Sequence, residues 1–319
     1  MILTALFMGI GFFLLFKGGD YLVTGAAGIA HKKNIPSFIV GITLVAFGTS
    51  APELFFNIIS ALHGNAEFAL SNVSGSNLIN IGIGIGGSAI VAPLLVSRKK
   101  FRKDLSFVCL GPAVVMLFVY LTSGPGLKFL HGILLLAGFA LYIYLTQKEL
   151  SRHNRETLQT LEACATASCR REWLIFALGC IMLYGGGEII YRNALAIVGY
   201  LGLSESIVGL TVIAVGTSIP DCAASIIATA KNHKDIAVGN ILGSNIFNIF
   251  LVLATTIVVF GKPMAFSASS YFDFGAVCVL SLAFSAYVLI RQRVGRLAGI
   301  ALLACYPAIL YVRIAFFNV

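Results

Sequence analysis

The sequence predicts an all-α integral membrane protein with ten transmembrane helices, arranged as two inverted five-helix repeats. Three observations support this prediction: an apolar composition, a bias of basic residues toward alternate loops, and an internal repeat. Apolar residues make up 58% of the 319-residue chain and charged residues 11%, and the mean hydropathy is +0.94. Soluble domains carry about 25% charged residues, so this composition excludes that class.

Continuous apolar segments separated by polar loops indicate spanning helices, because the strands of a membrane β-barrel are short and alternate in polarity. We expect ten such segments, at residues 2–30, 36–62, 68–92, 105–122, 128–147, 172–198, 204–230, 236–260, 272–291 and 295–316. We expect no cleavable signal peptide, because residues 1–16 lack a basic region and the apolar character resumes after Asp20.

Basic residues fall almost entirely in alternate loops. Seventeen of the 22 Lys and Arg residues lie in one set of loops and three in the other. This bias predicts that the first set is cytoplasmic and that both termini lie outside, and it accounts for the net charge of +9 without nucleic acid. We expect a prokaryotic plasma membrane, the lipid bilayer as surroundings and no obligate protein partner. Residues 148–171 form the predicted cytoplasmic connector between repeats 1–147 and 172–319.

An internal repeat organises the chain: adding 168 to a position in the first half gives its partner in the second, without a gap from residue 18 to 81. VGITLVAFGTSAPE at 40–53 matches VGLTVIAVGTSIPD at 208–221 in eight of fourteen positions, and 69–81 matches 237–249 in seven of thirteen. Five spans per half place the second half inverted in the bilayer. Inverted repeats with interrupted helices indicate a secondary transporter whose site lies near the midplane.

The first motif places oxygen-bearing side chains on one helical face. Thr49 and Glu53 are four residues apart, and Ser50 is one step round the helix. Pro52 cannot donate a backbone hydrogen bond, so it is expected to open the preceding turn and to free backbone carbonyls near Ala46. The second copy has the same groups at Ala214, Thr217, Ser218, Pro220 and Asp221.

The second motif adds hydroxyl and amide oxygens, again four residues apart. The pairs are Ser76 with Asn80 and Ser244 with Asn248. Hard oxygen donors of this kind suit Ca²⁺ and Na⁺. An ionised carboxylate in mid-bilayer is costly unless a counter-charge neutralises it. A bound Ca²⁺ would neutralise both central carboxylates, and protons or Na⁺ would compete with it, which predicts ion exchange.

These motifs resemble the two alpha-repeats of the sodium/calcium exchanger family, within the cation/calcium antiporters, which carry GTS-x-PE/D followed by GN-x-x-GSN-x-x-N/D. The resemblance covers both repeats and the ten-helix layout. It implies ion ligands at Ala46 (carbonyl), Thr49, Ser50, Glu53, Ser76, Asn80, Ala214 (carbonyl), Thr217, Ser218, Asp221, Ser244 and Asn248. It also implies that Glu53 and Asp221 bridge a central Ca²⁺, and that the first and sixth segments slide over the other eight.

The chain departs from the family pattern at three positions. Ser71 stands where the repeat usually has Gly, as at Gly239; Asp221 replaces the Glu common in prokaryotic members; and Asn248 replaces the Asp of many prokaryotic and potassium-dependent members. Asn248 therefore argues against K⁺ co-transport. With two carboxylates, a Ca²⁺-loaded site is near neutral and a site holding three Na⁺ is near +1, which predicts electrogenic exchange at about three Na⁺ per Ca²⁺.

Two other functions stay open. A Ca²⁺/H⁺ antiporter would exchange one Ca²⁺ for two or more protons at the same carboxylates, although the many hydroxyl and amide ligands favour Na⁺. A non-transporting ion sensor or scaffold is disfavoured, because the chain has little soluble part through which to signal. We expect neither enzyme activity nor a cofactor, with Ca²⁺ and Na⁺ as transported substrates.

Asp20 and Glu188 occupy matching positions within the first and sixth segments. Lys17 and Arg192 lie one helical turn away, so local charge pairs are expected. The alternative is that these carboxylates form a gate or an ion entry path in the sliding helices.

Overall fold

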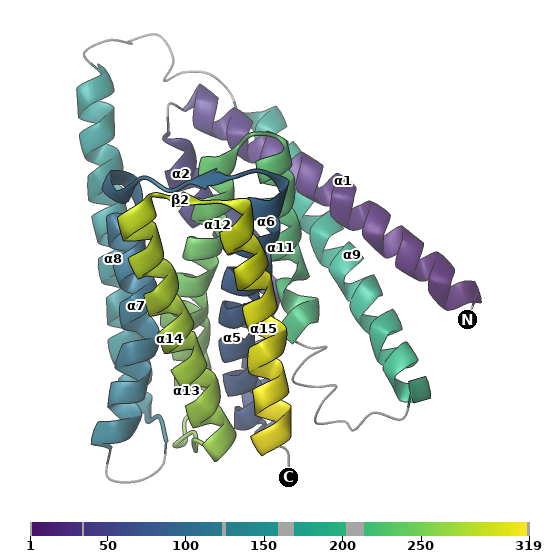
Figure 1. The fold of residues 1–319 in the computed structure, drawn as a ribbon. Coiled ribbons are helices and arrows are strands. Elements are labelled where there is room, and N and C mark those ends of the chain that lie inside the picture. Colours follow the sequence, from purple (N-terminus) through teal and green to yellow (C-terminus); the bar gives the residue numbers. More distant parts are fainter. Residues whose placement is uncertain (1, 34, 123–125, 159–168, 202–213, 318–319) are drawn as a thin grey trace.

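A computed structural model describes residues 2–33, 35–122, 126–158, 169–201 and 214–317, which form a helical bundle with one small two-stranded sheet (Figure 1). Its elements are α1 (Ile2–Lys32), α2 (Ser37–Val40), η1 (Gly41–Val45), α3 (Ala46–Thr49), α4 (Ala51–Leu62), α5 (Ala66–Ile79), η2 (Asn80–Ile85), α6 (Gly86–Val91), β1 (Leu94–Leu95), α7 (Arg98–Leu121), α8 (Phe129–Leu158), α9 (Arg170–Leu201), α11 (Ala214–Ala230), α12 (Lys234–Phe247), η4 (Asn248–Leu253), α13 (Ala254–Phe260), α14 (Ala268–Arg291), β2 (Arg293–Val294) and α15 (Arg296–Phe317).

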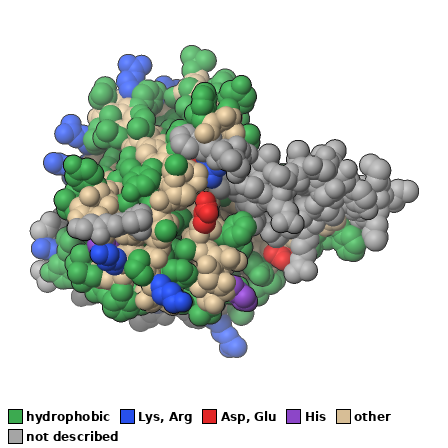
Figure 2. All heavy atoms as spheres, turned by 90° about the horizontal axis from the view of Figure 1, so that it is seen from below, with side chains coloured by type: hydrophobic (Ala, Val, Ile, Leu, Met, Phe, Trp, Pro, Cys, Tyr) green, Lys and Arg blue, Asp and Glu red, His purple; other side chains and the backbone are tan. Residues whose placement is uncertain are grey.

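Long apolar helices dominate the described residues, and hydrophobic side chains cover much of the surface seen in Figure 2. Within the described part of the chain, five helices are long and apolar enough to cross a membrane: Arg98–Leu121, Phe129–Ser151, Lys234–Phe260, Ala268–Arg291 and Arg296–Phe316. The bent pair Ser37–Thr49 and Ala51–Leu62 makes a sixth. By length and composition, up to six of the ten predicted spans are therefore present. The seventh falls partly on residues 202–213, outside the described residues, and α11 is its described part.

The 168-residue repeat is visible in the helices. α5 and α12 begin and end at positions 168 apart, and so do the π-helical turns η2 and η4 that follow them. η2 starts at Asn80 and η4 at Asn248, both of them predicted ligands. Such turns are rare and often lie at functional sites.

The two halves interleave. α12 of the second half packs across α2 and η1 of the first, and α5 of the first half packs against α11 of the second. Gly243 permits the first contact, because a Cβ there would lie 2.6 Å from the carbonyl oxygen of Ile42. Gly75 permits the second, since its Cβ would lie 2.8 Å from that of Ala214. Each half thus contributes one motif helix to each crossing, which brings all four motifs together.

Short backbone pairings join the halves at two further places. β1 pairs antiparallel with β2, with Leu94 opposite Val294. An isolated bridge joins Leu127 to Met264. In each pairing, the loop after the third predicted span of one half contacts the loop before the fifth predicted span of the other half. These pairings therefore also follow the repeat.

α1 and α9 form a separate pair along one side of the bundle (Figure 1). Their backbones approach closely, because a Cβ at Gly25 would lie 2.6 Å from the nitrogen of Phe176. Packing through small residues is typical of helices associating in membranes. An ion pair between Lys32 and Glu172 (2.8 Å) also joins the two helices.

α8 continues beyond the predicted span, through residues 148–158 of the predicted connector, because the polar residues there are good helix formers. One local prediction is wrong. Asp20 pairs with Lys231 at the end of α11 instead of with Lys17, and Lys231 also donates to the Thr24 hydroxyl (2.8 Å). Tertiary packing brings this distant lysine against α1. The side chain of Arg192 lies outside the described residues.

Candidate functional site

Two carboxylates lie buried where the halves interleave. Glu53, near the start of α4, is 1% exposed, and Asp221, in the middle of α11, is 0% exposed. The helix before Glu53 breaks at Ser50 (φ −91°, ψ 5°), and the segments on either side differ in direction by 44°. Pro52 lies in the first turn of α4, so this break occurs where the proline predicts it.

Two expectations about the prolines are wrong. The Ala46 carbonyl is not free, because it accepts hydrogen bonds from the backbone nitrogen of Ser50 (2.9 Å) and the hydroxyl of Thr49 (3.3 Å). The hydrogen bond that Pro52 cannot donate is the one to the carbonyl of Gly48, which is two residues after Ala46. In addition, α11 continues through Pro220 without a break. A proline removes one hydrogen bond, and the packing around it decides whether the helix breaks or continues.

Each carboxylate lies beside a serine from the other half. The Ser50 hydroxyl is 3.4 Å from Asp221 Oδ1, and the Ser218 hydroxyl is 3.5 Å from Glu53 Oε1. These four residues are two pairs related by the 168-residue offset. The repeat in the sequence is therefore also a symmetry of contacts.

The two threonines also hydrogen bond across the halves, to two asparagines that were not among the predicted site residues. Thr49 donates to Asn240 Oδ1 and Thr217 donates to Asn72 Oδ1, both at 3.1 Å. Asn240 also donates to the Asp221 carbonyl (3.0 Å). The signal was available, since this asparagine is identical in both copies of the repeat.

Asp221 has more partners than Glu53. Asn80 Nδ2 donates to Asp221 Oδ2 and the Ser244 hydroxyl donates to Asp221 Oδ1, both at 3.0 Å. In the repeat, Asn80 corresponds to Asn248 and Ser244 corresponds to Ser76. Asn248 and Ser76 are fully buried, but they hydrogen bond to neither carboxylate. The Ala214 carbonyl accepts from the Thr217 hydroxyl (3.4 Å).

Several buried oxygens of the predicted ligands have no hydrogen-bond partner: Glu53 Oε2, Ser76 Oγ, Asn80 Oδ1 and Asn248 Oδ1. Buried polar atoms are normally satisfied, so such a group requires an explanation. All four are hard oxygens that Ca²⁺ or Na⁺ accepts as ligands. The donor chemistry therefore fits a cation site.

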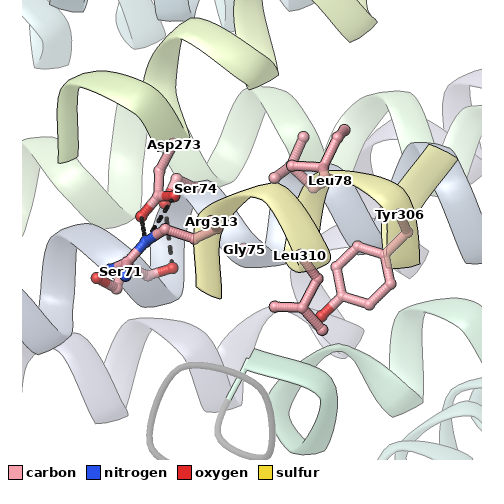
Figure 3. Close-up of a pocket in the computed structure, with 9 residues that line it drawn as sticks. Ser71, Ser74, Gly75, Leu78, Asp273, Tyr306, Leu310 and Arg313 are labelled. Atoms are coloured by element: carbon pink, nitrogen blue, oxygen red, sulfur yellow. Dashed lines mark hydrogen bonds and ion pairs between the residues drawn. The ribbon is translucent and has the colours of Figure 1, made fainter. Parts of the chain in front are cut away.

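The described residues include four buried acids, and they differ in how they are neutralised. Asp104 lies 3.7 Å from Lys103, and Asp273 pairs with Arg313 (3.2 Å; Figure 3). Neither Glu53 nor Asp221 forms an ion pair with a basic side chain of the described residues. Because an isolated buried carboxylate is costly, cations or protons from solution must supply the missing charge.

A small cavity beside α5 contains the Asp273–Arg313 pair (Figure 3). Ser71 and Ser74 line it, and its volume of about 20 Å³ suits one water molecule. Ser71, which departs from the family pattern, thus faces α14 and α15 instead of the two unpaired carboxylates.

Comparison with known proteins identifies the family of the chain. The family model for sodium/calcium exchanger protein matches residues 3–147 and 171–315. The chain belongs to the sodium/calcium exchanger family. Members of this family are ion transporters, so the protein is a cation/Ca²⁺ antiporter by family and a multi-pass membrane protein by its helices.

Individual relatives of this exchanger match over nearly the whole chain. The inner membrane protein YrbG of Escherichia coli is 32% identical over 89% of this chain and 88% of its own. The sodium/calcium exchanger MaX1 of Methanosarcina acetivorans is 27% identical over 95% and 96%. A structure of the sodium-calcium exchanger NCX_Mj, soaked with Na⁺ and Sr²⁺, superposes with a TM-score of 0.83 at 26% identity over 100% of both chains.

Proposed function

We propose that this exchanger transports Ca²⁺ and Na⁺ in opposite directions, with Glu53 and Asp221 bridging a central Ca²⁺. The observation that carries the proposal is the pair of buried carboxylates without a basic partner, beside unpartnered hydroxyl and amide oxygens. Relatives named sodium/calcium exchangers support Na⁺ as the coupling ion. The twelve predicted ligands are proposed as the ion-binding residues, ten of them contributing neutral oxygens. To bind an ion, the Ala46 carbonyl would exchange its hydrogen bond from the Thr49 hydroxyl for the ion.

Charge decides the proposed stoichiometry. Two carboxylates neutralise one Ca²⁺, whereas three Na⁺ leave the site near +1, so exchange of about three Na⁺ per Ca²⁺ moves net charge. The rate should then depend on the membrane potential. Ca²⁺ flux that ignores an imposed potential in K⁺-free liposomes would overturn this part of the proposal.

We propose ten spans in two inverted repeats, residues 1–147 and 172–319, with 148–171 as a cytoplasmic connector and both termini outside. The matching π-helical turns and the repeat-related backbone pairings support two equivalent halves. The bias of 17 basic residues against three supports the orientation. α1 and α9, packed on each other along the side of the bundle, are the proposed sliding pair.

The Asp20–Lys231 ion pair links this sliding pair to α11. We propose that it holds α1 in the position seen here and that it must break when the helices slide. Lys231→Gln should therefore change the exchange rate about twofold or more, with little change in the Ca²⁺ concentration that gives half-maximal rate. Unchanged transport in Lys231→Gln, and in Asp20→Asn combined with Glu188→Gln, would remove Lys231, Asp20 and Glu188 from the mechanism.

The deciding experiment is Ca²⁺ uptake into proteoliposomes, driven by an outward Na⁺ gradient in one arm and by a pH gradient in the other. Uptake should follow the Na⁺ gradient and be absent in Glu53→Gln. Uptake driven by the pH gradient without Na⁺ would instead establish Ca²⁺/H⁺ exchange. Uptake in neither arm would contradict the transport of Ca²⁺.

A further inference from the structure

The two central carboxylates lie on two helical hairpins related by the 168-residue repeat. α4 and α5 form the first hairpin, and α11 and α12 form the second. In the second hairpin, side chains bond across the two helices at two successive levels. Ser244 donates to Asp221 Oδ1 (3.0 Å), and one helical turn nearer the connecting loop Asn240 Nδ2 donates to the Ser225 hydroxyl (2.9 Å). Both levels of the second hairpin are therefore closed by hydrogen bonds.

The matching levels of the first hairpin are open. Glu53 and Ser76 occupy one level, and Asn57 and Asn72 occupy the next. All four residues are buried. Four of their polar atoms have no hydrogen-bond partner among the described residues: Glu53 Oε2, Ser76 Oγ, Asn57 Oδ1 and Asn72 Nδ2. Buried polar atoms are normally satisfied, so the first hairpin needs a ligand that the second does not.

Residue 57 explains the difference between the hairpins, because the repeat is asymmetric there. The second copy has Ser225 at this position, and the Asp221 carbonyl one turn before it accepts from Asn240 Nδ2 (3.0 Å). In the first copy, the Glu53 carbonyl accepts instead from Asn57 Nδ2 (2.7 Å). Asn57 therefore takes the acceptor that closes the second hairpin, and its own Oδ1 stays free.

Asn72 keeps the orientation of its counterpart Asn240. The Oδ1 atoms of both accept from a threonine of the opposite half at 3.1 Å, Asn72 from Thr217 and Asn240 from Thr49. The Asn72 amide nitrogen is thus directed back to its own hairpin, where Asn57 occupies the carbonyl it would otherwise reach. A water molecule that accepts from Asn72 Nδ2 could complete the shell of an ion bound beside it.

We infer that Asn57 is a further Na⁺ ligand and determines specificity for Na⁺, with the ion held between Asn57 Oδ1, Glu53 Oε2 and Ser76 Oγ. This inference rests on the proposed exchange and adds to it a residue from outside the two repeated motifs. All three atoms are hard oxygens, and Asn57 lies one turn from Glu53 on the same helical face. The group carries one negative charge, which Na⁺ neutralises, whereas Ca²⁺ would leave a costly buried positive charge.

The Na⁺ position lies toward the predicted outside. α4 runs from Glu53 through Asn57 to the loop at residues 63–65, which is expected to be external. The corresponding loop of the second hairpin, at residues 231–233, is expected to be cytoplasmic. Because only the external hairpin is open, Na⁺ should bind more tightly from the external side.

Asn57→Ser copies the second hairpin into the first. It removes the Oδ1 ligand and frees the Glu53 carbonyl for Asn72. The dissociation constant for Na⁺, obtained from the rise in melting temperature of the full-length protein in detergent as NaCl replaces choline chloride, should increase about tenfold. The constant for Ca²⁺ in Na⁺-free buffer should stay within about twofold, because Ca²⁺ is proposed to bind between the two carboxylates. Asn57→Ala should give the same separation of the two ions.

The matched control is Asn77→Ser. Asn77 Nδ2 donates to the Val73 carbonyl four residues before it (2.7 Å), so this variant removes the same kind of bond from the same hairpin. It should leave the ratio of the Na⁺ and Ca²⁺ constants unchanged. An unchanged Na⁺ constant in Asn57→Ser, an equal change for both ions, or the same change of ratio in the control would overturn this inference and leave the proposed exchange standing. No stabilisation of the wild type by Na⁺ would overturn both.

Discussion

The carboxylates of the two halves have different surroundings although the sequence presents them as equivalents. Asp221 is close to three donors, from Ser50, Asn80 and Ser244. Among the described residues, the Ser218 hydroxyl lies 3.5 Å from Glu53 Oε1, and Glu53 Oε2 has no hydrogen-bond partner. A cation can therefore bind Glu53 Oε2 without replacing a hydrogen bond, whereas at Asp221 it must compete with the donors on both oxygens. The repeat thus sets which groups face the site, and local pairing sets how available each one is.

The largest effects should come from the carboxylates themselves. Glu53→Gln and Asp221→Asn should each reduce Na⁺-driven Ca²⁺ uptake at least about 100-fold, because each removes half of the site's negative charge. Their thermal unfolding in ion-free detergent should differ. Asp221→Asn presents an amide donor to the donors of Asn80 and Ser244 and should lower stability by about 1–3 kcal/mol, whereas Glu53→Gln should leave it unchanged or raise it. Equal destabilisation would contradict the proposed difference.

The asparagines should show the next largest difference. Asn240 accepts from Thr49 and donates to Asp221 and Ser225, whereas Asn72 accepts from Thr217 and its amide nitrogen has no partner. Asn240→Ala should therefore raise the Ca²⁺ concentration for half-maximal uptake about tenfold, and Asn72→Ala by less. Proteoliposome uptake over a Ca²⁺ titration measures both. A larger effect at Asn72 would reverse the comparison.

The two serines of the second motif, Ser76 and Ser244, differ in whether they form a hydrogen bond within the protein. Ser244 donates to Asp221 Oδ1 (3.0 Å), whereas the Ser76 hydroxyl has no hydrogen-bond partner among the described residues. Ser244→Ala should lower stability in ion-free buffer by about 1 kcal/mol. Ser76→Ala should leave that value unchanged but reduce the stabilisation produced by added Na⁺ or Ca²⁺, with a several-fold loss of affinity. Thermal shift with and without ions tests this, and an ion response unchanged in Ser76→Ala would remove Ser76 from the ligands.

The prolines should have the smallest effects, of opposite sign. Pro52 lies at the start of α4, a position that suits proline, whereas Pro220 lies inside α11. Pro52→Ala should lower the melting temperature and reduce uptake about threefold, because the bend positions Glu53. Pro220→Ala adds a backbone donor to a continuous helix, so it should raise the melting temperature and keep uptake within about twofold. Similar losses in both variants would show that the bend is not specific to the first half.

Much of the candidate site could be predicted because it depends on spacing within single helices. The offset of 168 residues identified both motif copies, and the four-residue spacings placed Thr49 with Glu53 and Ser76 with Asn80 on common faces. The proline located the break before Glu53. These are short-range consequences of helix geometry and backbone hydrogen bonding, which the order of residues sets directly.

Pairing across helices could not be predicted in the same way. The order of residues indicated that Asp20 would meet Lys17, but packing places Lys231 against it. It assigned no role to Asn72 and Asn240, although both bond to threonines of the opposite half. It also predicted the same geometry around Pro52 and Pro220, whereas the chain bends before Pro52 and the helix continues through Pro220 without a break. Such contacts depend on which surfaces meet after the halves interleave, and the periodicity of one segment carries no information about its neighbour's side chains.

The residues alone therefore specified an apolar, twofold-repeated chain with a Glu in one copy and an Asp in the other. The tertiary structure determined that Asp221 is surrounded by donors and that Glu53 is the more available carboxylate. The physical reason is that hydroxyls and amides from three different helices converge on one carboxylate, and only interleaved packing can bring them there.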